Sequence, residues 1–233
     1  ISVQALGATR TSVISGNWNS TAVWGGTAPV AGDNVIIGSG TTVTINVNTV
    51  SINDIVVQSA ATLQGDGTGK ILQYGTGGGE DLTNSGTLDL SGAHRARLRL
   101  VGASQWGGSG GTWLLDTLDL NTRAVTFTAG SAFTVRLTGS GTPIISPGSI
   151  TGLSTMTFDF AGSAAQTLPN TSNVRFGNLL ANNPAGLTLR IALSTTNLLG
   201  DLRVLQGTLS NGGFTITGNA SKQFEVAAGA RFL

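Results

Sequence analysis

Hydrophobic and polar residues alternate in short runs along most of the chain, and the runs are rich in β-branched side chains. A period of two places one side of each run in a core and the other side toward solvent, which predicts half-buried strands. Clusters of Gly, Asn, Ser and Pro separate the runs and predict turns. The sequence therefore predicts an all-β protein. The clearest runs are Val43–Val47, Ile52–Val57, Val125–Thr128, Phe133–Leu137, Met156–Phe160, Leu187–Ile191 and Phe214–Thr217.

A short phrase recurs among these strands. Residues Gly86–Ser91 read Gly-Thr-Leu-Asp-Leu-Ser, Asp116–Asn121 read Asp-Thr-Leu-Asp-Leu-Asn, and Gly207–Gly212 begin in the same way. A degenerate repeat of about 20 to 30 residues predicts a solenoid of roughly eight to ten coils, in which stacked neighbours supply the core that one coil lacks. A two-sheet sandwich is the alternative, but it needs regular hairpin turns, and only Asn211–Gly212 has that sequence.

We therefore expect a single-domain parallel β-helix, or β-solenoid, over residues 16–233. Residues 1–15 precede it as a strand-like N-terminal extension, because Ile1, Val3 and Ala5 alternate with polar residues.

Composition narrows the classes of partner. Among the 233 residues 39% are hydrophobic, which is enough for a core, and 10% are charged. The net charge of +1 gives no long-range field for nucleic acid or an anionic membrane, and neither is an expected partner. Cysteine is absent, so disulfides do not hold the fold, and no apolar run approaches the ~20 residues of a membrane-spanning helix. The chain begins at Ile1 without a signal segment, which we interpret as a processed, exported polypeptide.

Eight segments of the chain share a recognisable pattern of turns and short strands. They are Gly16–Trp24, Pro29–Ile37, Gly40–Ile45, Ala60–Leu63, Phe160–Leu168, Phe176–Asn183, Leu205–Leu209 and Phe224–Ala230. These segments resemble secreted bacterial parallel β-helix proteins of the surface and adhesin-like type. The resemblance implies a parallel β-helix located outside the cell or on its surface. It does not define an activity, because such proteins include adhesins, matrix proteins and some polysaccharide enzymes.

The two ends of a solenoid are candidate interaction sites, because each leaves a coil without a neighbour. Trp18 and Trp24 could cover the first coil as a cap, or could be ordinary core aromatics. The extension could be donated as a strand to a neighbouring subunit, or could pack on its own chain. The predicted assembly interface comprises Ile1, Val3, Val13 and Ile14 of the extension, with Phe224, Val226, Phe232 and Leu233 of the last strands.

An arginine-rich strand forms a second candidate surface. Strand alternation places Arg95, Arg97 and Arg99 on one face, and Ala96, Leu98 and Leu100 on the other. The arginines form either a solvated outer face or a binding strip for an acidic glycan or an acidic strip of a neighbouring subunit.

Candidate catalytic groups are few, and we expect no catalytic residues, no metal and no cofactor. His94 is the only histidine, which leaves little basis for a Ser-His-Asp triad. Asp116 and Asp119 are the densest carboxylate pair, and Asp89 would stack near Asp119 if one coil separated the repeated phrases.

Three further features of the sequence are weak signals of ligand binding. The segment 77–81 is only faintly similar to a calcium-binding β-roll repeat. The segment Gly65–Lys70 lacks the spacing of a phosphate loop and predicts a turn. A sugar platform, if present, would use Trp106 or Trp113.

Together these observations predict a secreted, non-enzymatic structural protein. It would form an extracellular filament or matrix by head-to-tail assembly with itself, through the solenoid ends and N-terminal strand donation. The alternative is a surface protein that binds or cleaves extracellular polysaccharide.

Overall fold

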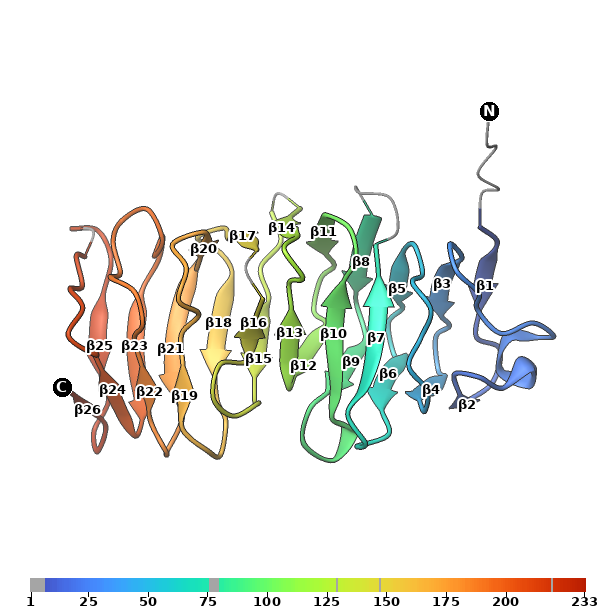
Figure 1. Ribbon diagram of the computed structural model, residues 1–233, viewed down its shortest axis with the longest axis horizontal. Coiled ribbons are helices and arrows are strands. Elements are labelled where there is room, and N and C mark those ends of the chain that lie inside the picture. Colours follow the sequence, from blue (N-terminus) through green and yellow to red (C-terminus); the bar gives the residue numbers. More distant parts are fainter. Residues whose placement is uncertain (1–6, 76–79, 129, 147, 219) are drawn as a thin grey trace.

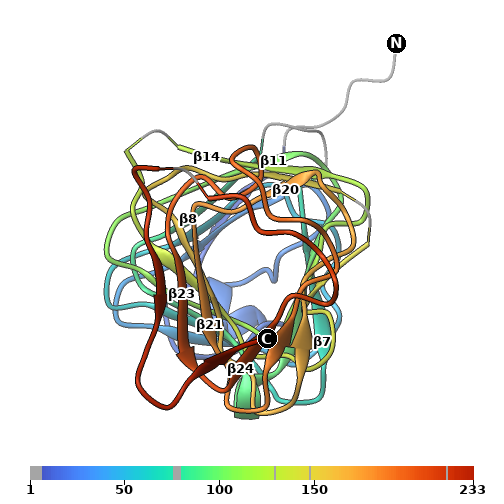
Figure 2. The same ribbon diagram turned by 90° about the vertical axis from the view of Figure 1, so that its left-hand side faces the viewer.

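The computed structural model describes residues 7–75, 80–128, 130–146, 148–218 and 220–233. It is an all-β parallel β-solenoid of about nine turns, which confirms the predicted fold class. Figure 1 shows the coils stacked along one long axis, with the first and last coils at opposite ends. Figure 2 looks along this axis and shows each coil running around it.

Three faces of the solenoid are built from four sheets, and every strand pairing among the described residues is parallel. Sheet A contains β1 (Thr9–Thr11), β3 (Asn34–Ile37), β5 (Ile55–Val57), β8 (Glu80–Asn84), β11 (Ser104–Gly107), β14 (Ala124–Phe127), β17 (Ser149–Thr151) and β20 (Val174–Arg175). Sheet B contains β2 (Gly16–Asn17), β4 (Thr42–Ile45), β6 (Thr62–Gly65), β9 (Thr87–Leu90), β12 (Thr112–Leu115), β15 (Thr134–Leu137), β18 (Thr157–Phe160), β21 (Asn178–Asn182), β23 (Leu202–Gln206) and β25 (Phe224–Val226).

The third face is divided between two shorter sheets. Sheet C contains β7 (Lys70–Tyr74), β10 (Ala96–Leu100), β13 (Thr117–Asp119) and β16 (Ile144–Ile145). Sheet D contains β19 (Gln166–Thr167), β22 (Leu187–Thr188), β24 (Thr208–Ser210) and β26 (Arg231–Phe232). The two short 3-10 helices of the described chain are η1 (Thr21–Trp24) and η2 (Gly92–His94).

In-register pairing stacks like positions into columns that run along the axis. On sheet B the inward column is almost completely buried from the second coil to the ninth, because each side chain contacts the one above and the one below. Its members are Val43, Leu63, Leu88, Trp113, Val135, Phe158, Leu179 and Leu202, followed by Phe224 in the last coil.

An aromatic cluster fills the middle of the core. The ring of Trp113 stacks on Trp106 at a centroid distance of 5.1 Å, and on Phe133 at 4.7 Å. Edge-to-face contacts continue the cluster through Phe127 and Phe158. The geometry is that preferred by aromatic pairs.

The corners between faces bring neighbouring coils close together, which explains part of the glycine content. At Gly86, a Cβ atom would lie 2.3 Å from the carbonyl oxygen of Gln58 and 2.4 Å from that of Ala61. Polar side chains at other corners are buried with partners. The amide of Gln166 donates to the carbonyl oxygens of Leu137 and Gly139, so its burial is compensated.

The first coil includes part of the predicted N-terminal extension. β1 pairs in register with β3, and the backbone N–H of Val13 donates to the carbonyl oxygen of Val23, so this stretch is already paired within its own chain. Ile1 and Val3 lie outside the described residues.

The repeated phrases do not stack on one another, which corrects the expected register. Thr87–Leu90 belongs to sheet B and pairs with Thr112–Leu115, whereas Thr117–Asp119 belongs to sheet C and pairs with β10. The phrases look alike because each supplies a strand with the same alternation, but they occupy different faces.

Asp33 attaches the first coil to the second. Its carboxylate accepts hydrogen bonds from the side chain of Arg10 (2.8 Å) and from the backbone N–H groups of Ala8 (2.8 Å) and Val30 (3.1 Å). Burial by itself raises the pKa of Asp33, but the hydrogen bonds, led by that of Arg10, lower the pKa below its ordinary value of 3.8. The ionised form is therefore the one that the folded coil favours.

We predict that Asp33→Asn destabilises the first coil at neutral pH by about 1.5–3 kcal/mol, because hydrogen bonds to a charged group are lost. A lowered pKa contributes stability that is present above pH 3.8 and is lost as pH falls through the folded-state value. Hydrogen exchange of the Ser12 and Asn34 amides, which lie at the β1–β3 contact, measures the effect. Half-buried Asp54 provides the control, and equal effects of Asp54→Asn and Asp33→Asn would contradict the assignment.

A second prediction compares two members of the same inward column. Phe158→Ala should cost about 3–5 kcal/mol of unfolding free energy, because the side chain is fully buried in the middle of the solenoid. Phe224→Ala should cost clearly less in the dilute monomer, because that side chain is 51% exposed. Urea unfolding followed by circular dichroism measures the unfolding free energy of both variants. Equal losses of unfolding free energy would contradict the prediction, because they would show that Phe224 is as well buried as Phe158.

Candidate binding surfaces

Exposed hydrophobic side chains gather toward the two ends of the solenoid. Among the residues that the structure describes, the exposed large hydrophobics are Val13, Ile14, Val30, Val50, Phe214, Phe224, Val226, Phe232 and Leu233. Three belong to the first coil and the turn that leaves it, and five belong to the last coil. Val50 alone in this set lies elsewhere, so the side walls are nearly free of exposed apolar groups.

The C-terminal end exposes residues that occupy core positions. Phe224 and Val226 continue inward columns of sheet B from Leu202 and Val204, and Phe232 stacks on Leu209 in sheet D. The coil beneath them is buried, whereas these three side chains are 39–51% exposed. The rings of Phe224 and Phe232 contact each other edge to face at 5.2 Å. The last described coil thus presents an open apolar core.

The N-terminal end is arranged differently. Trp18 and Trp24 are buried and meet edge to face at 5.2 Å, and the indole N–H of Trp24 donates to the carbonyl oxygen of Trp18. Trp24 belongs to η1, and Figure 1 shows this short helix at the N-terminal extremity of the solenoid. Both tryptophans belong to the hydrophobic core, and their role as a cap stays a prediction. Val13, beside η1, stays exposed.

The arginine strip has the predicted orientation, but a carboxylate partly neutralises it. Ala96, Leu98 and Leu100 are buried, and the arginines face outward from β10. Asp119 of the next coil lies 3.9 Å from the guanidinium of Arg97 and 3.6 Å from that of Arg99. A cavity of about 200 Å³ beside Arg95 and Arg97 also includes the carboxylate-bearing Asp116. The mixed charge makes this strip a weak candidate for an acidic ligand.

The outer face of sheet B carries two regular columns of side chains. One is a threonine column made of Thr42, Thr62, Thr87, Thr112, Thr134 and Thr157. The other contains, from the fifth coil to the last, Leu114, Arg136, Asp159, Leu180, Arg203 and Glu225. Successive members are separated by the spacing of neighbouring strands, about 4.8 Å.

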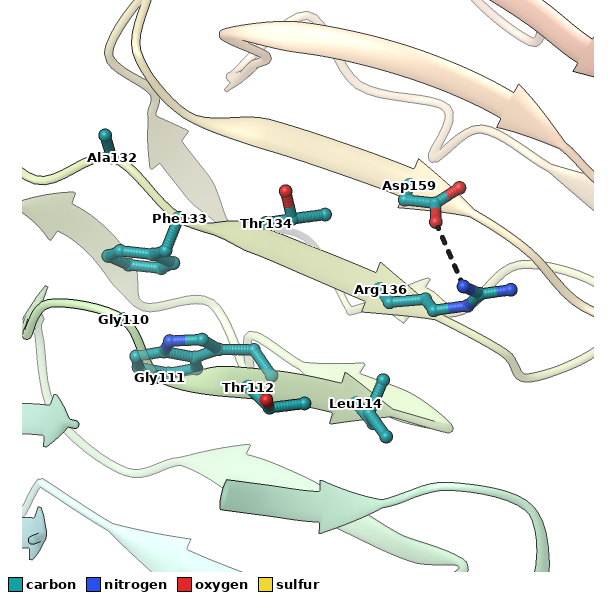
Figure 3. Close-up of a pocket in the computed structure, with 10 residues that line it drawn as sticks. Gly110, Gly111, Thr112, Leu114, Ala132, Phe133, Thr134, Arg136 and Asp159 are labelled. Carbon is teal, nitrogen blue, oxygen red and sulfur yellow. Dashed lines mark ion pairs between the residues drawn. The ribbon is translucent and has the colours of Figure 1, made fainter. Parts of the chain in front are cut away.

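A groove crosses these columns in the middle of the solenoid. It has a volume of about 350 Å³ and is lined by residues of β12, β15 and β18 and of the turns before β12 and β15. Figure 3 shows Thr112, Leu114, Thr134, Arg136 and Asp159 along it, with Phe133 and the two glycines Gly110 and Gly111 at one end.

The Arg136–Asp159 pair in this groove is open. Nη1 of Arg136 lies 3.7 Å from Oδ2 of Asp159, which is beyond hydrogen-bond distance. The equivalent pair three coils further along the same column is closed, because Nε of Arg203 donates to Oε2 of Glu225 at 2.7 Å. The same charge arrangement therefore occurs twice, once with a direct contact and once without.

Asp159 has an incompletely compensated carboxylate. Only 5% of the residue is exposed, and Oδ1 has no hydrogen-bond partner among the described residues. Asn182 lies 3.5 Å from Oδ2. Burial raises the pKa of Asp159, and this effect outweighs the opposing effects of Arg136 and Asn182. A buried titratable group with a perturbed pKa in a groove is typical of a functional site.

The predicted chemical candidates do not converge on a catalytic arrangement. Asp89 pairs with Leu114 on sheet B, whereas Asp119 pairs with Arg99 on sheet C, so the expected stacking of these carboxylates is wrong. Asp116 accepts a hydrogen bond from the hydroxyl of Thr117. His94 lies in η2, with Nδ1 3.3 Å from the carbonyl oxygen of Gly65.

The remaining sequence motifs have structural positions. Trp106 and Trp113 are at most 1% exposed, so the predicted sugar platform at these rings is wrong. The segment Gly65–Lys70 connects β6 to β7, and Asp66 accepts two hydrogen bonds from Thr68 there. Residues 77–79 of the calcium-like segment lie outside the described residues. In the described ranges no three His, Cys, Asp or Glu side chains gather as a metal site.

Comparisons with known proteins add no identification: no protein-family model, curated protein or solved structure matches this chain. No helix in the described part of the chain is long and apolar enough to cross a membrane. The fold, a parallel β-solenoid, is the class that the structure defines.

The sequence reasoning missed Arg136 and Asp159. Both stand at the polar position of an alternating strand, Thr-Val-Arg-Leu in β15 and Thr-Phe-Asp-Phe in β18. An alignment of these two runs suggests the pair, because both read Thr, hydrophobic, charged, hydrophobic.

We predict that Asp159→Asn leaves the unfolding free energy at about pH 7 equal to or higher than that of the wild type, because a buried charge is removed. A raised pKa means that wild-type stability falls as pH rises through the folded-state value, so the difference should vanish near about pH 3. Urea unfolding at both pH values tests this. Glu225→Gln is the matched control in the exposed pair, and a large loss of stability in Asp159→Asn alone would show that the carboxylate is a structural necessity.

Proposed function

We propose that this protein is a non-catalytic structural β-solenoid that assembles head to tail with copies of itself. The observation that supports the proposal is the concentration of exposed hydrophobic side chains at the two ends, with nearly none on the side walls. Monomers rarely expose contiguous apolar patches without a partner.

The C-terminal end supplies one half of the proposed contact. Phe224 and Val226 occupy positions that are buried in every preceding coil of sheet B from the second onward, and Phe232 follows the buried residues Gln166, Leu187 and Leu209 on sheet D. Full burial of such a side chain contributes about 1.5–3 kcal/mol each. The unpaired edges of β25 and β26 lie beside them and can accept a further layer.

The N-terminal end of a second copy is the proposed occupant. Val13 and Ile14 are 59% and 53% exposed and lie beside η1, so they offer an apolar patch to the open coil. The two patches differ, which makes the contact heterologous. Such contacts propagate into a filament unless the rotation closes a ring. The net charge of +1 opposes association only weakly.

The contact is proposed between end faces, with Val13 and Ile14 contributing their side chains. Donation of the strand Thr9–Thr11 would first require it to leave β3. Release would also break the Arg10–Asp33 ion pair, whose nitrogen–oxygen distance is 2.8 Å. A contact between end faces leaves both the pairing of β1 with β3 and the Arg10–Asp33 ion pair intact.

A structural role is consistent with the separation of the candidate carboxylates on sheets B and C. A location outside the cell stays a proposal that rests on the resemblance of the sequence to secreted β-helix proteins. The alternative of a glycan-binding surface has its own supporting observation on the side wall, described below.

Assembly is tested by analytical ultracentrifugation over a range of concentrations, with electron microscopy of the most concentrated sample. The wild type should associate in a concentration-dependent way, and the double variants Phe224→Ser/Phe232→Ser and Val13→Ser/Ile14→Ser should each be monomeric. Val50→Ser is the control, because Val50 is 46% exposed away from both ends, and it should associate like the wild type.

Mixing the two double variants distinguishes the orientation of the contact. Each variant retains one intact end, so the mixture should form heterodimers that grow no further. If the Val13→Ser/Ile14→Ser variant associates by itself as strongly as the wild type, the contact joins two C-terminal ends and is not head to tail. A wild type that stays monomeric at all concentrations would overturn the proposal.

A further inference from the structure

The open Arg136–Asp159 pair lies in the side-wall groove among polar groups that have no protein partner. The hydroxyls of Thr112 and Thr134 make no hydrogen bond to other described residues, and both residues are exposed on the threonine column. The side chain of Trp113 borders the groove from the core side, where its indole N–H is buried without an acceptor in the described part of the chain. Buried polar groups of folded proteins normally have partners.

We propose that this groove binds one hexopyranose unit of a neutral glycan, with a sugar hydroxyl placed between Arg136 and Asp159. A hydroxyl both donates and accepts, so it can accept from the guanidinium and donate to the carboxylate. The 3.7 Å separation leaves the pair without the direct hydrogen bond that closes Arg203–Glu225. A polar nitrogen and oxygen that lie more than 3.5 Å apart, as these do, can be bridged by a hydroxyl group or a water molecule.

The neighbouring residues suit the rest of a sugar ring. Leu114 is half-buried next to Arg136 on the same column and offers an apolar surface to C–H groups. Thr112 and Thr134 provide hydroxyls for further sugar oxygens. Gly110 and Gly111 line one end of the groove. A Cβ atom on Gly110 would meet nothing within 4 Å, whereas one on Gly111 would lie 2.3 Å from the carbonyl oxygen of Asn84.

Charge and size limit the class of ligand. The buried carboxylate of Asp159 disfavours an anionic sugar, because a second negative charge beside it would be repelled. The volume of about 350 Å³ is near the lower limit of ligand pockets, roughly 300–1,000 Å³, which suits a single ring with the rest of the chain outside. Neutral hexose units therefore fit better than uronic acids.

The inference does not depend on the proposed assembly. The groove lies in the fifth to seventh coils, on the side wall, and none of its lining residues belongs to the proposed end contacts. Variants of Phe224 and Val13 should bind sugar normally, and variants of Arg136 should assemble normally. The experiments therefore distinguish a failure of the assembly proposal from a failure of the sugar-binding proposal.

Isothermal titration calorimetry with cellotetraose, maltotetraose, mannotetraose and β-1,4-galactotetraose tests the proposal, with tetragalacturonate as the acidic comparison. At least one neutral probe should bind with a dissociation constant below about 1 mM. Arg136→Gln and Asp159→Asn should each weaken its binding about tenfold or more, because a hydrogen bond to a charged group is lost. The backbone amide signals of Arg136 and Asp159 in nuclear magnetic resonance spectra should shift on binding.

Arg203→Gln and Glu225→Gln are the matched controls, because they change the same charges on the same column outside the groove. They should leave affinity unchanged. Circular dichroism and urea unfolding establish that Arg136→Gln and Asp159→Asn remain folded. The proposal is overturned if no neutral probe binds, if only tetragalacturonate binds, or if the groove variants bind as tightly as the controls.

Discussion

The structure depends on one constraint, the in-register parallel pairing of each coil with the next. Once Val43 lies beside Leu63, and Leu63 beside Leu88, the direction of every neighbouring side chain on sheet B follows from strand alternation. Core columns, outer columns and tight corners are all results of this pairing. Stability then comes from interfaces between neighbouring coils, as in other repeat architectures.

The same constraint explains why the ends differ from the middle. A coil inside the solenoid has two neighbours, so its inward side chains are covered on both sides. At the N-terminal end, Trp18 and Trp24 are buried, and Trp24 is the last residue of η1. At the other end, Phe224 and Val226 have a neighbour on one side. The molecule therefore has a direction along its axis, and its two ends offer different chemistry.

Much of the fold could be predicted from local patterns. Alternation placed Ala96, Leu98 and Leu100 inside and the neighbouring arginines outside, because this distinction requires only a period of two. The number of coils followed from the spacing of strands and turns. These features depend on residues that are close in sequence, so they can be predicted without knowing the conformation of the turns.

Register and sites could not be predicted in the same way. Which residues meet across coils depends on the length of every intervening turn, and these lengths vary. Asp89 and Asp119 looked equivalent in sequence but lie on different faces, and Trp113 turned inward with its strand. Arg136 and Asp159 are 23 residues apart, so their contact becomes visible only when β15 is laid on β18. The exposure of the Phe224 side chain likewise follows from how the coils stack, so its local sequence does not reveal it.

The outer columns have a consequence for how such a surface can change. Leu114, Arg136 and Leu180 stand on the outer face of sheet B, half-buried or exposed, and lie outside the core columns. Effects of substitutions at separated sites are usually additive. A mutation on one coil therefore alters a single position of the wall and leaves the scaffold intact, so recognition could diversify coil by coil during evolution while the fold is preserved.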